Sequence, residues 1–356
     1  MTESQKILVI NPGSTSTKIA LFDRTKMLKE LELAHSTDAL SRFKSNLDQL
    51  DYRLEKVLNA MKEWGISAGD LSAAIGRGGP LKPVEGGVYN VGEALMSDLQ
   101  SGKLVDHASI LGGLIAYKLA KEAGIPAYIA DPVSVDEFEE IARISGRPDI
   151  PRISLSHALN IKAVVAEVAA EAGKKPEDMN YVVAHLGGGI SVAAHRKGRQ
   201  IDVNNANDAG PFSPERCGTL PLSGLLKKCF SGKYDLKSLK KELIGNSGLV
   251  AHLGTADCRE IAKMIENGDE KAKLVFEAMA YNISKEIGAM ATVLKGEVDA
   301  IILTGGVAYS PYIVKWVKER VSFIAPVIVK PGQNELKALA AHAVNALAHP
   351  EKVKNY

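Results

Sequence analysis

The sequence contains few cysteines and no long apolar run. Its three cysteines, Cys217, Cys229 and Cys258, form no CxxC pair and cannot all pair with one another, so they predict neither a disulfide framework nor a zinc site. No stretch approaches the roughly 18 apolar residues of a membrane-spanning helix. The apolar run after Lys6 has only four residues, too few for the core of a signal peptide. We therefore expect a protein of the reducing cytoplasm that is neither exported nor embedded in a membrane.

The chain also lacks a strong charge of either sign. A formal net charge of +2 on 356 residues provides no basic field of the kind that binds nucleic acid or anionic membranes, so we expect a small-molecule partner. The length favours about two domains of roughly 150 residues each. Glycine, in contrast, is abundant, with 32 residues, many of them in short clusters where a ligand can approach the backbone closely.

The most informative stretch lies near the start of the chain. Two apolar runs, Ile7–Ile10 and Ile19–Phe22, flank Asn11–Lys18, a segment of small and hydroxyl side chains that ends in a lysine. This pattern predicts a β-hairpin whose tip binds phosphate, because hydroxyl groups, backbone N–H groups and the lysine all offer donors to anionic oxygens. It is not a Walker P-loop, since no glycine directly precedes the lysine and a β pattern follows.

A similar unit recurs in the second half of the chain. The strand-like run Tyr181–Leu186 leads through a triple glycine into the run Ile190–Ala194. Each half later contains a strand that ends in paired glycines, within Ala74–Gly79 and Ala300–Gly306. Amphipathic segments alternate with β-branched runs elsewhere, as in α/β proteins. These repeats predict an internal duplication with two phosphate-binding hairpins.

We expect from this pattern an α/β chain with a duplicated, actin-like (ribonuclease H-like) two-domain fold and an active site in the interdomain cleft. A dinucleotide-binding site is not indicated, because no G-x-G-x-x-G is present and the triple glycine leads into a strand. The turn-rich run Ser145–Pro151 predicts the domain boundary. Residues 1–150 would form the N-terminal actin-like domain and residues 151–335 the C-terminal one, with the C-terminal helix 336–356 rejoining the first.

Segments across essentially the whole chain resemble the butyrate kinases, within the acetate and propionate kinase branch of the actin-like superfamily. The matching segments, in the family's order, are Asn11–Lys18, Gly76–Pro80, His107–Ser109, Asp131–Val133, His157–Asn160, His185–Gly189, Gly210–Arg216, Thr304–Gly306 and Pro331–Glu335. The resemblance implies a short-chain carboxylate kinase. Such an enzyme transfers the γ-phosphoryl group of ATP reversibly to butyrate, or to a similar C3–C5 acid including branched ones, and forms acyl phosphate and ADP by direct in-line transfer.

The resemblance also implies the catalytic residues, which are Arg77, His107, Asp131, His157, Arg216 and Glu335. An ionised carboxylate needs no general base, but it must approach an anionic phosphoryl group, so cations should converge there. Arg77 and Arg216 can hold either group through paired hydrogen bonds. His157 resembles the family histidine that contacts the transferring phosphoryl group, and His107 resembles a supporting one.

The same resemblance places the cofactors. Asp131 and Glu335 would hold Mg²⁺, directly or through its waters. ATP or ADP would be bound by phosphate contacts in both halves and by adenosine contacts in the second domain. The residues implied are Asn11, Ser14, Ser16, Lys18, Gly187, Gly188 and Gly189 for phosphate, and Asp257, Arg259, Gly305 and Gly306 for adenosine. A homo-oligomer, a dimer or a multiple of it, is expected by analogy alone.

The carboxylate is expected at Arg77, Gly78, Gly79, Ser156 and Arg216. Acetate kinases have valines after the first site arginine and a phenylalanine before the phosphoryl-contacting histidine, so Gly78, Gly79 and Ser156 predict a larger acyl pocket. Each methylene buried there would add roughly 0.8 kcal/mol of binding. The chain departs from the usual butyrate kinase pattern at Ser156, at Cys217 and at Gln333-Asn334.

Two other functions stay open. A sugar or polyol kinase of the same superfamily would use Asp131 as general base for a hydroxyl group, and an actin-like or chaperone-like ATPase would use the cleft for conformational signalling. The paired arginines favour the carboxylate kinase. His185 is interpreted as bracing the glycine loop, and four other histidines are interpreted as core or surface residues; these are His35, His195, His342 and His349.

Overall fold

The computed structural model describes residues 4–101 and 104–356 and divides the chain into two compact units. Unit 1 contains the chain through Val135 and again from Asn334 to Tyr356, whereas unit 2 contains Asp136–Gln333. The division falls ahead of the turn-rich run near residue 150. The reason is that Phe138 and Ala142 pack into a core cluster of unit 2, which joins the segment between Asp136 and this run to the second unit.

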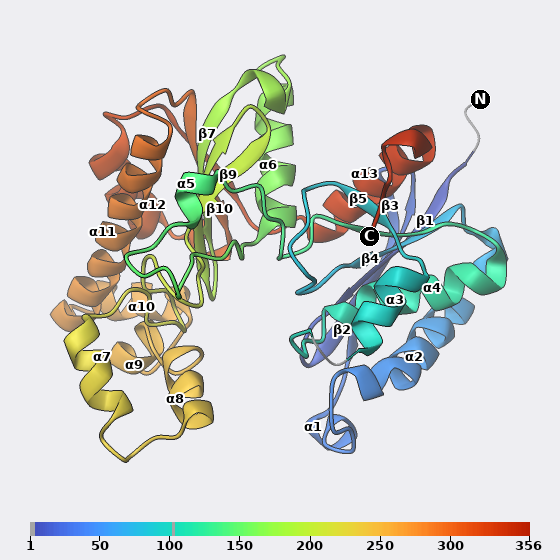
Figure 1. The fold of residues 1–356 in the computed structure, drawn as a ribbon, viewed down its shortest axis with the longest axis horizontal. Helices are drawn as coiled ribbons and strands as arrows, with labels where there is room; N and C mark the ends of the chain where they lie inside the picture. The colour runs from blue at the N-terminus through green and yellow to red at the C-terminus, as the bar shows by residue number, and fades with distance from the viewer. Residues whose placement is uncertain (1–3, 102–103) are drawn as a thin grey trace. The chain divides into compact units, whose positions relative to one another are not determined.

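Unit 1 is built on a seven-stranded sheet, whose strands are β1 (Lys6–Pro12), β2 (Ser16–Asp23), β3 (Lys26–Ala34), β4 (Ala73–Arg77), β5 (Val88–Asn90), β6 (Ala127–Ala130) and β12 (Lys354–Asn355). Their order across the sheet is β12-β5-β6-β4-β1-β2-β3 (Figure 1). β1–β2 and β2–β3 are antiparallel, and β1–β4 and β4–β6 are parallel. Ile7–Ile10 of β1 is buried throughout, as expected for a strand with both faces covered.

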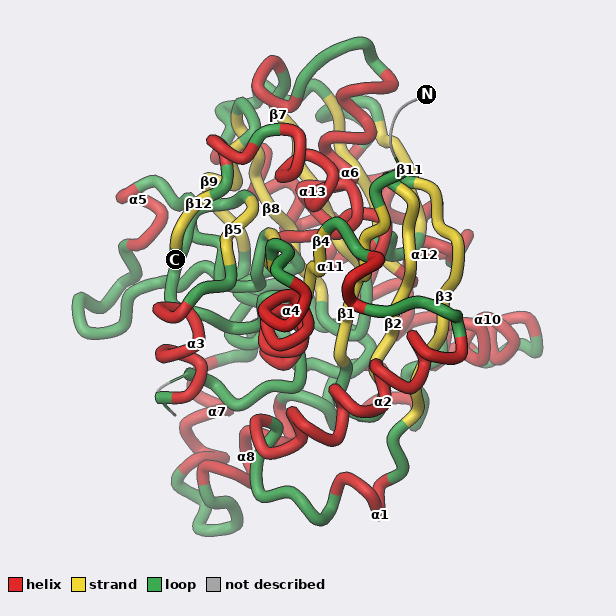
Figure 2. Tube along the Cα trace, turned by 90° about the vertical axis from the view of Figure 1, so that its right-hand side faces the viewer, coloured by secondary structure: helices red, strands yellow, loops and turns green. Residues whose placement is uncertain are grey.

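Helices cover both faces of this sheet (Figure 2). The helices of unit 1 are α1 (Thr37–Leu40), α2 (Leu50–Glu63), α3 (Glu93–Gln100), α4 (Ile110–Ala123) and α13 (Glu335–Ala348). α4 packs on β4 and β6, and α2 packs on α4, whereas α13 packs on β1 and β4 from the other side. α4 approaches β4 closely because glycines face each other there: a Cβ on Gly76 would lie 2.0 Å from the backbone carbonyl carbon of Gly112.

Unit 2 is built on a five-stranded sheet, whose strands are β7 (Asn180–Leu186), β8 (Ile190–Arg196), β9 (Arg199–Val203), β10 (Ala300–Gly305) and β11 (Val327–Pro331). Their order is β11-β10-β7-β8-β9. β7 alternates between two cores: Val182, Ala184 and Leu186 pack in one cluster, and Tyr181 and Val183 pack in another. This period of two is what a strand covered on both faces requires.

Eight helices are assigned among the described residues of unit 2, all of which lie within Asp136–Gln333. They are α5 (Glu140–Arg143), α6 (Ala158–Glu171), α7 (Leu222–Cys229), α8 (Leu236–Leu243), α9 (Leu249–Leu253), α10 (Cys258–Glu266), α11 (Glu270–Val293) and α12 (Pro311–Val321). α6 packs on β7 and β10, α11 packs on β7 and β8, and α12 packs on α11. Figure 1 shows α6 and α11 on opposite faces of the sheet. As expected from Ser310-Pro311, the Ser310 side chain caps α12 and Pro311 is its first residue.

The internal duplication predicted from the sequence is confirmed. Five strands of unit 1, in the order β3-β2-β1-β4-β6, match β9-β8-β7-β10-β11 of unit 2. The orientations match as well, with two antiparallel pairs followed by two parallel pairs in each set. Both hairpins therefore occupy the same place in their sheets, β1–β2 in unit 1 and β7–β8 in unit 2.

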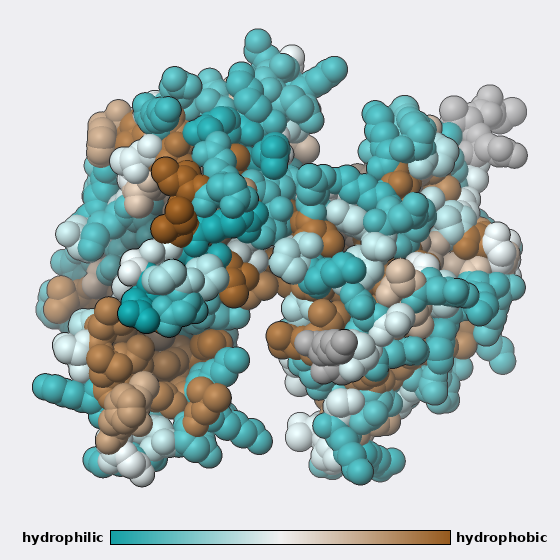
Figure 3. Space-filling view, in the orientation of Figure 1, coloured by the Kyte–Doolittle hydropathy of each residue, from teal (hydrophilic) through white to brown (hydrophobic). Residues whose placement is uncertain are grey.

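The helices α7 and α8 form the outer part of unit 2. α7 buries none of its residues, and its side chains Leu222 and Leu226 are exposed, as are Phe230 and Leu236. Figure 3 shows a hydrophobic area at the lower left, over this part of the unit. Within residues 4–101 and 104–356, no helix combines the length and the hydrophobicity that a membrane crossing requires.

Candidate active site

The first hairpin places its predicted phosphate contacts on one face. The segment Asn11–Lys18 between the two apolar runs predicts a loop of eight residues. The loop is shorter, because β1 and β2 stay paired up to the three-residue tip Gly13–Thr15. The register pairs Asn11 with Lys18, and strand alternation places both side chains, together with Ser16, on the face opposite to Thr17. Lys18 is exposed, whereas Thr17 is fully buried.

The hydroxyl groups at this tip differ in their surroundings. Ser14 is exposed, and the Ser16 hydroxyl donates a hydrogen bond to Glu32 Oε1 over 2.7 Å. Ser16 would have to leave this exposed partner to bind a phosphate oxygen. Glu32 lies on β3, where it is paired with Lys18, and the cost of that exchange is one solvent-exposed hydrogen bond.

Glu335 links two of the predicted site residues. It is the first residue of α13, and its side chain is 10% exposed. Its Oε2 accepts hydrogen bonds from Asn11 Nδ2 at 2.8 Å and from Arg77 Nη1 at 3.1 Å. Arg77 ends β4, and its side chain is 23% exposed. The carboxylate therefore restrains an amide at the end of β1 and a guanidinium at the end of β4, side by side.

Asp131 is held in an unusual backbone conformation directly after β6. Its φ is 37°, and the residue is only 3% exposed. Its Oδ1 accepts a hydrogen bond from the Gly87 N–H at 2.7 Å, and its Oδ2 lies 3.0 Å from His342 Nε2. Positive φ in a non-glycine residue is often found at functional sites. His342, interpreted from the sequence as a core or surface residue, instead contacts a predicted site residue.

His107, the supporting histidine of the prediction, lies just before α4. The residue is exposed, and its Nδ1 lies 2.7 Å from Ser109 Oγ. Ser109 is buried directly before α4. Its contact with Nδ1 therefore restrains one edge of the His107 imidazole ring relative to the start of this helix.

The glycines after Arg77 are closely packed by residues of unit 1. A Cβ on Gly78 would lie 2.9 Å from Pro132 Cβ and 3.2 Å from Ile129 Cδ1, and a Cβ on Gly79 would lie 2.7 Å from Ile110 Cγ2. Gly79 also has a φ of 72°, which disfavours any other residue. These glycines are therefore needed for packing, and the volume beside them is filled within the unit. The larger acyl pocket predicted from them stays a prediction.

In unit 2, the turn after β7 brings the triple glycine against the motif that contains Arg216. A Cβ on Gly189 would lie 2.5 Å from Arg216 Nη1, and a Cβ on Gly188 would lie 2.8 Å from Glu215 Oε2. The Ser213 hydroxyl joins the two segments, because it donates to the Gly188 carbonyl and accepts from the Arg216 N–H. Only a residue without a side chain at position 189 lets the guanidinium lie against this turn.

The Arg216 side chain is half-buried without a charged partner at hydrogen-bond distance among the residues that the structure describes. Burial lowers the pKa of its guanidinium, and the nearby charge of Glu215 acts in the opposite direction. An arginine remains cationic at any physiological pH. Its donors therefore point to an anionic ligand at this turn.

Two histidines stack behind the same turn. The rings of His157 and His185 lie 4.0 Å apart at an angle of 13°. His157 Nδ1 lies 3.0 Å from Ser191 Oγ, while buried His185 is bracketed by Asn160 Nδ2, 2.9 Å from its Nδ1, and by Gln333 Nε2, 3.2 Å from its Nε2. Both edges of His185 are thus fixed, and its face positions the His157 ring at the start of α6.

Ser156, the third predicted acyl-pocket residue, is buried beside β9. Its hydroxyl exchanges hydrogen bonds with the side-chain amide of Gln200, at 3.2 Å to Oε1 and 3.1 Å from Nε2. Gln200 is itself fully buried. The small serine therefore makes room for a polar contact inside unit 2, one residue ahead of His157.

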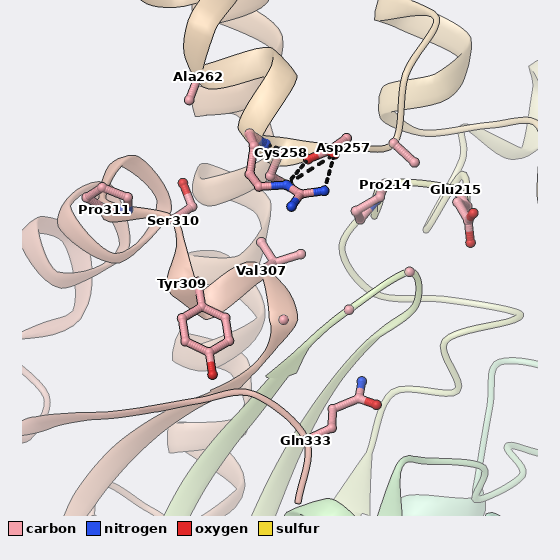
Figure 4. Close-up of a pocket in the computed structure, with 15 residues that line it drawn as sticks. Pro214, Glu215, Asp257, Cys258, Ala262, Val307, Tyr309, Ser310, Pro311 and Gln333 are labelled. Carbon is pink, nitrogen blue, oxygen red and sulfur yellow. Dashed lines mark hydrogen bonds and ion pairs between the residues drawn. The ribbon is translucent and has the colours of Figure 1, made fainter. Parts of the chain in front are cut away.

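A pocket of about 640 Å³ lies within unit 2 (Figure 4), a size typical of small-ligand sites. It brings together five of the predicted nucleotide contacts, Gly187, Gly188, Asp257, Arg259 and Gly306. The other residues that line it are Pro214, Glu215, Ala256, Cys258, Ala262, Val307, Tyr309, Ser310, Pro311 and Gln333. Gly189 and Gly305 are not among its lining residues. One end of the pocket is thus formed by the glycine turn and the other by the starts of α10 and α12.

The polar wall of the pocket is formed by an ion pair at the start of α10. Asp257 caps this helix, and its Oδ2 lies 2.6 Å from Arg259 Nη2 (Figure 4). This contact lowers the pKa of Asp257 to about 2. Cys258 lies between them, and burial raises the pKa of its thiol to about 11, so it contributes as a small apolar residue. Apolar walls with a few fixed polar groups suit a nucleoside.

Gly305 fixes the backbone next to the pocket. It has a φ of 88°, and a Cβ there would lie 2.3 Å from the Leu186 carbonyl oxygen. Its backbone also exchanges two hydrogen bonds with Gly332, at 3.1 and 3.0 Å. Gly305 therefore holds the ends of β7, β10 and β11 together and is required for the backbone geometry beside Gly306.

The predicted magnesium ligands fit a metal that arrives with the nucleotide. In the described part of the chain, no three His, Cys, Asp or Glu side chains gather into a metal cage. Mg²⁺ on nucleotide phosphates usually keeps several waters and takes one or two carboxylates. Asp131 and Glu335 are 3% and 8% exposed and already accept protein hydrogen bonds, which suits contact through water.

Several residues that contact the predicted ones are not indicated by the sequence. The sequence predicts no site role for His342, and the contacts of Asn160 and Ser191 with the histidine pair have no local signal. Gln333 differs from the family pattern in the sequence, and in the structure its Nε2 lies 3.2 Å from His185 Nε2. Tyr309 lines the pocket. It lies three residues after the paired glycines Gly305-Gly306 at the end of β10, and this motif is the signal in the sequence that could have indicated it.

Comparison with known proteins places these features in a family. The pattern that defines the acetokinase family matches residues 156–325. The chain is 53% identical over 351 residues to the probable butyrate kinase 2 of Caldanaerobacter subterraneus subsp. tengcongensis, covering 99% of each chain. The crystal structure of Porphyromonas gingivalis acetate kinase is similar with a TM-score of 0.79 at 19% identity, over 97% of this chain and all of that one. A propionate kinase from Francisella tularensis has a TM-score of 0.70 at 18% identity, over 95% and 98% of the chains.

The duplicated sheets and these structural neighbours define an actin-like α/β fold, which confirms the predicted fold class. The similarity over nearly the full length is decisive for the family. The chain belongs to the acetokinase family, and is thus a carboxylate kinase that uses ATP and ADP. The resemblance identified from the sequence motifs is confirmed.

Proposed function

We propose that this protein phosphorylates a short-chain carboxylate of three to five carbons, with butyrate as the reference substrate. A carboxylate oxygen attacks the γ-phosphorus of ATP in line, the bond from this phosphorus to the β,γ-bridging oxygen breaks, and ADP leaves with the electron pair. The product is an acyl phosphate, and the reaction is reversible. The name of the relative at 53% identity supports butyrate.

Charge, and not proton transfer, is the difficulty of this reaction. The carboxylic acid has a pKa near 4, like the side chain of Asp or Glu, so it is ionised at neutral pH and needs no general base. Stabilising the charge of the transferring phosphoryl group is the main contribution that a protein makes to such a transfer. The observation that carries the proposal is the half-buried guanidinium of Arg216 lying against Gly189, at the edge of the nucleotide-sized pocket.

The contacts of each residue support the other proposed roles. Arg77, restrained by Glu335, is proposed to bind the carboxylate, and His157, restrained through Nδ1, to donate to the transferring phosphoryl group. His107 is proposed to support the site. Mg²⁺, when bound with ATP, would neutralise charge on the β- and γ-phosphate oxygens. Asp131 and Glu335 are proposed to hold its waters.

The nucleotide contacts are proposed on both units. The pocket of unit 2 suits adenosine, with Asp257 and Arg259 on its polar wall and Gly305 and Gly306 beside it. The phosphates are proposed to meet the glycine turn of unit 2 and the tip of the first hairpin. The residues concerned are Gly187, Gly188, Gly189, Asn11, Ser14, Ser16 and Lys18.

A hydroxamate assay tests this proposal directly. Protein, ATP, Mg²⁺ and one acid of a C2 to C6 series, straight and branched, are incubated with hydroxylamine, which converts acyl phosphates into coloured hydroxamates. We expect the highest kcat/KM with a C3–C5 acid and a loss of about a hundredfold or more in Arg216→Lys. Arg199→Lys, at an exposed position of β9, is the matched control. Absence of hydroxamate from every acid would refute the proposed function.

No observation favours the sugar or polyol kinase as a second candidate. That function requires Asp131 as general base, but both of its carboxylate oxygens are engaged, one by the Gly87 N–H and one by His342. A homo-oligomeric state and a cytoplasmic location stay predictions from the sequence, as does the position of the active site in a cleft.

A further inference from the structure

α2 carries an arginine that is buried completely. Arg53 has an exposed fraction of 0% and is the largest fully buried side chain among the described residues. Its helix packs on β3 and α4 of unit 1 (Figure 2). A buried guanidinium is expensive unless its donors are satisfied and its charge is compensated. Its partners therefore indicate why the chain keeps an arginine at this position.

Three of these partners are backbone carbonyl groups at the first hairpin tip and at the start of β2. Arg53 Nη1 donates to the carbonyl oxygens of Gly13 at 2.8 Å and Ser16 at 3.1 Å, and Nη2 donates to that of Ser14 at 3.0 Å. Nη1 also donates to the buried Thr17 hydroxyl at 3.0 Å. One side chain on α2 thus binds two of the three carbonyl groups of the tip and that of Ser16, the first residue of β2.

The remaining donors are also satisfied by a neutral group. Nε and Nη2 donate to Gln49 Oε1 at 2.9 and 2.8 Å, one helical turn away. No carboxylate is among the six hydrogen bonds that Arg53 makes within the described residues. His35 Nε2 lies 2.9 Å from the same Thr17 hydroxyl, and burial together with the charge of Arg53 lowers the pKa of His35 to about 4. A buried positive charge therefore lies beside the tip, and no carboxylate of the described residues is hydrogen-bonded to it.

The contacts also determine where the N–H groups of the tip point. In a trans peptide the C=O and the following N–H are antiparallel, so carbonyl groups of Gly13 and Ser14 turned toward Arg53 direct the N–H groups of Ser14 and Thr15 away from it. Within residues 4–101 and 104–356, neither N–H donates to a protein acceptor. Ser14 and Thr15 are both exposed. Two N–H donors are therefore presented to solvent at the tip.

The strand register puts the predicted phosphate contacts away from Arg53. Thr17, which binds Arg53, faces α2, whereas Asn11 and Lys18 are paired on the opposite face of the hairpin. The hairpin tip is consequently polar on both sides. The buried guanidinium of Arg53 lies on one side, and the side-chain donors of Asn11 and Lys18 lie on the other. Such an arrangement of backbone N–H groups is typical of anion-binding sites.

We propose that Arg53 is a positioning residue for the phosphate-binding tip of the first hairpin. It aligns the carbonyl groups of the tip so that the backbone N–H groups face the phosphates, and it supplies a positive charge that a bound polyphosphate compensates. The identity of that polyphosphate as ATP rests on the proposed function. The binding of a phosphate anion at the tip does not.

Two variants separate the shape of the tip from the charge behind it. Arg53→Lys keeps the charge and loses the planar group that reaches several carbonyl groups at once, whereas Arg53→Met removes both. Arg152→Lys is the matched control, because Arg152 of unit 2 also donates to carbonyl oxygens, those of Ala142 and Val203, and lies outside the predicted site residues. All variants are made with Trp316→Phe, which leaves Trp64 at the end of α2 as the only tryptophan.

Kinetics by the hydroxamate assay give the first readout. We expect kcat/KM for ATP to fall about tenfold in Arg53→Lys and about a hundredfold or more in Arg53→Met, the loss expected from a displacement of about 1 Å. The KM for the acid should change little, and the control should keep both parameters. Unchanged ATP kinetics in a folded Arg53→Met variant would overturn the proposal. If this variant does not fold, as Trp64 fluorescence would show, the Lys variant decides in the same way.

Stabilisation by inorganic pyrophosphate gives a second readout that does not depend on turnover. Pyrophosphate should raise the urea midpoint of unit 1, followed by Trp64, in the protein with an intact Arg53, and raise it less in Arg53→Lys. Equal stabilisation of both, or none in either, would overturn the proposal. A protein that makes no hydroxamate but shows the expected difference with pyrophosphate would refute the proposed function and support the role of Arg53.

Discussion

Replacing Gly189 by alanine tests the arrangement of Arg216 with a single methyl group. The added Cβ would lie 2.5 Å from Arg216 Nη1, 2.6 Å from Cζ and 3.0 Å from Nε. Contacts below 3.0 Å are not tolerated, so the guanidinium has to move by about 1 Å to reach an ordinary contact distance. The φ of Gly189 is not positive, so alanine fits the backbone and the effect is confined to this contact.

The expected consequence is a loss of activity without a loss of fold. A displacement of about 1 Å at a group that stabilises the transition state costs about a hundredfold in kcat, equivalent to about 2.7 kcal/mol. The hydroxamate assay measures kcat, and thermal unfolding followed by Trp316 fluorescence, in a Trp64→Phe background, checks unit 2. The KM for ATP should change less than kcat, because adenosine is bound elsewhere in the pocket.

Two alanine variants calibrate this experiment. Gly188→Ala meets only the carboxylate end of Glu215, at 2.8 Å, which is an exposed side chain that can move, so its loss in kcat should be much smaller. Gly224→Ala lies on α7 with nothing within 4 Å of the new Cβ and should keep full activity. Equal kcat values for the Gly188 and Gly189 variants would refute the placement of Arg216 against this turn.

Three further predictions concern other parts of the protein. The pKa of His35 is lowered from 6.5 to about 4, so between these pH values the unfolded chain binds a proton that the folded protein does not. Between pH 7 and 4.5, the free energy of unfolding should therefore fall by about 2.5 kcal/mol more in the wild type than in His35→Gln. Urea unfolding at both pH values measures this difference, and an equal fall in both proteins would contradict the prediction. Glu335→Gln keeps an oxygen for its partners but loses the charge, so kcat should need a higher Mg²⁺ concentration, and an unchanged Mg²⁺ titration would exclude its metal role. Asp257→Asn keeps a helix cap and loses the ion pair with Arg259. We expect the KM for ATP to rise a few-fold while the KM for the acid stays constant. A change in the KM for the acid alone would show that this ion pair does not contact the nucleotide.

The repeated hairpins could be predicted because their signals are local. Apolar runs before and after Asn11–Lys18, and before and after the triple glycine, define strands and turns by themselves. The strands that end in paired glycines mark the duplication. The length of the first tip was overestimated, because the pairing of Asn11 with Lys18 depends on the opposite strand and has no signature of its own.

Candidate site residues at strand ends could also be predicted, since motifs there are short and contiguous. Arg77, Asp131 and Arg216 all lie at such ends or in glycine-rich turns. Their partners could not be found in the same way. Glu335 reaches Arg77 across 258 positions of the chain, and His342 reaches Asp131 from α13, so these pairs exist only after the last helix has packed on the sheet of unit 1.

The amino-acid sequence by itself determined the class of fold and the duplication, because both are written in local patterns of apolar residues and glycines, and its motifs predicted the residues for phosphoryl transfer. Tertiary structure alone decided which glycines are needed for packing, which amides hold the histidine pair, and that Arg53 binds the hairpin tip from inside the unit. These contacts join residues distant in the chain, and their geometry is set by how helices pack on the sheets.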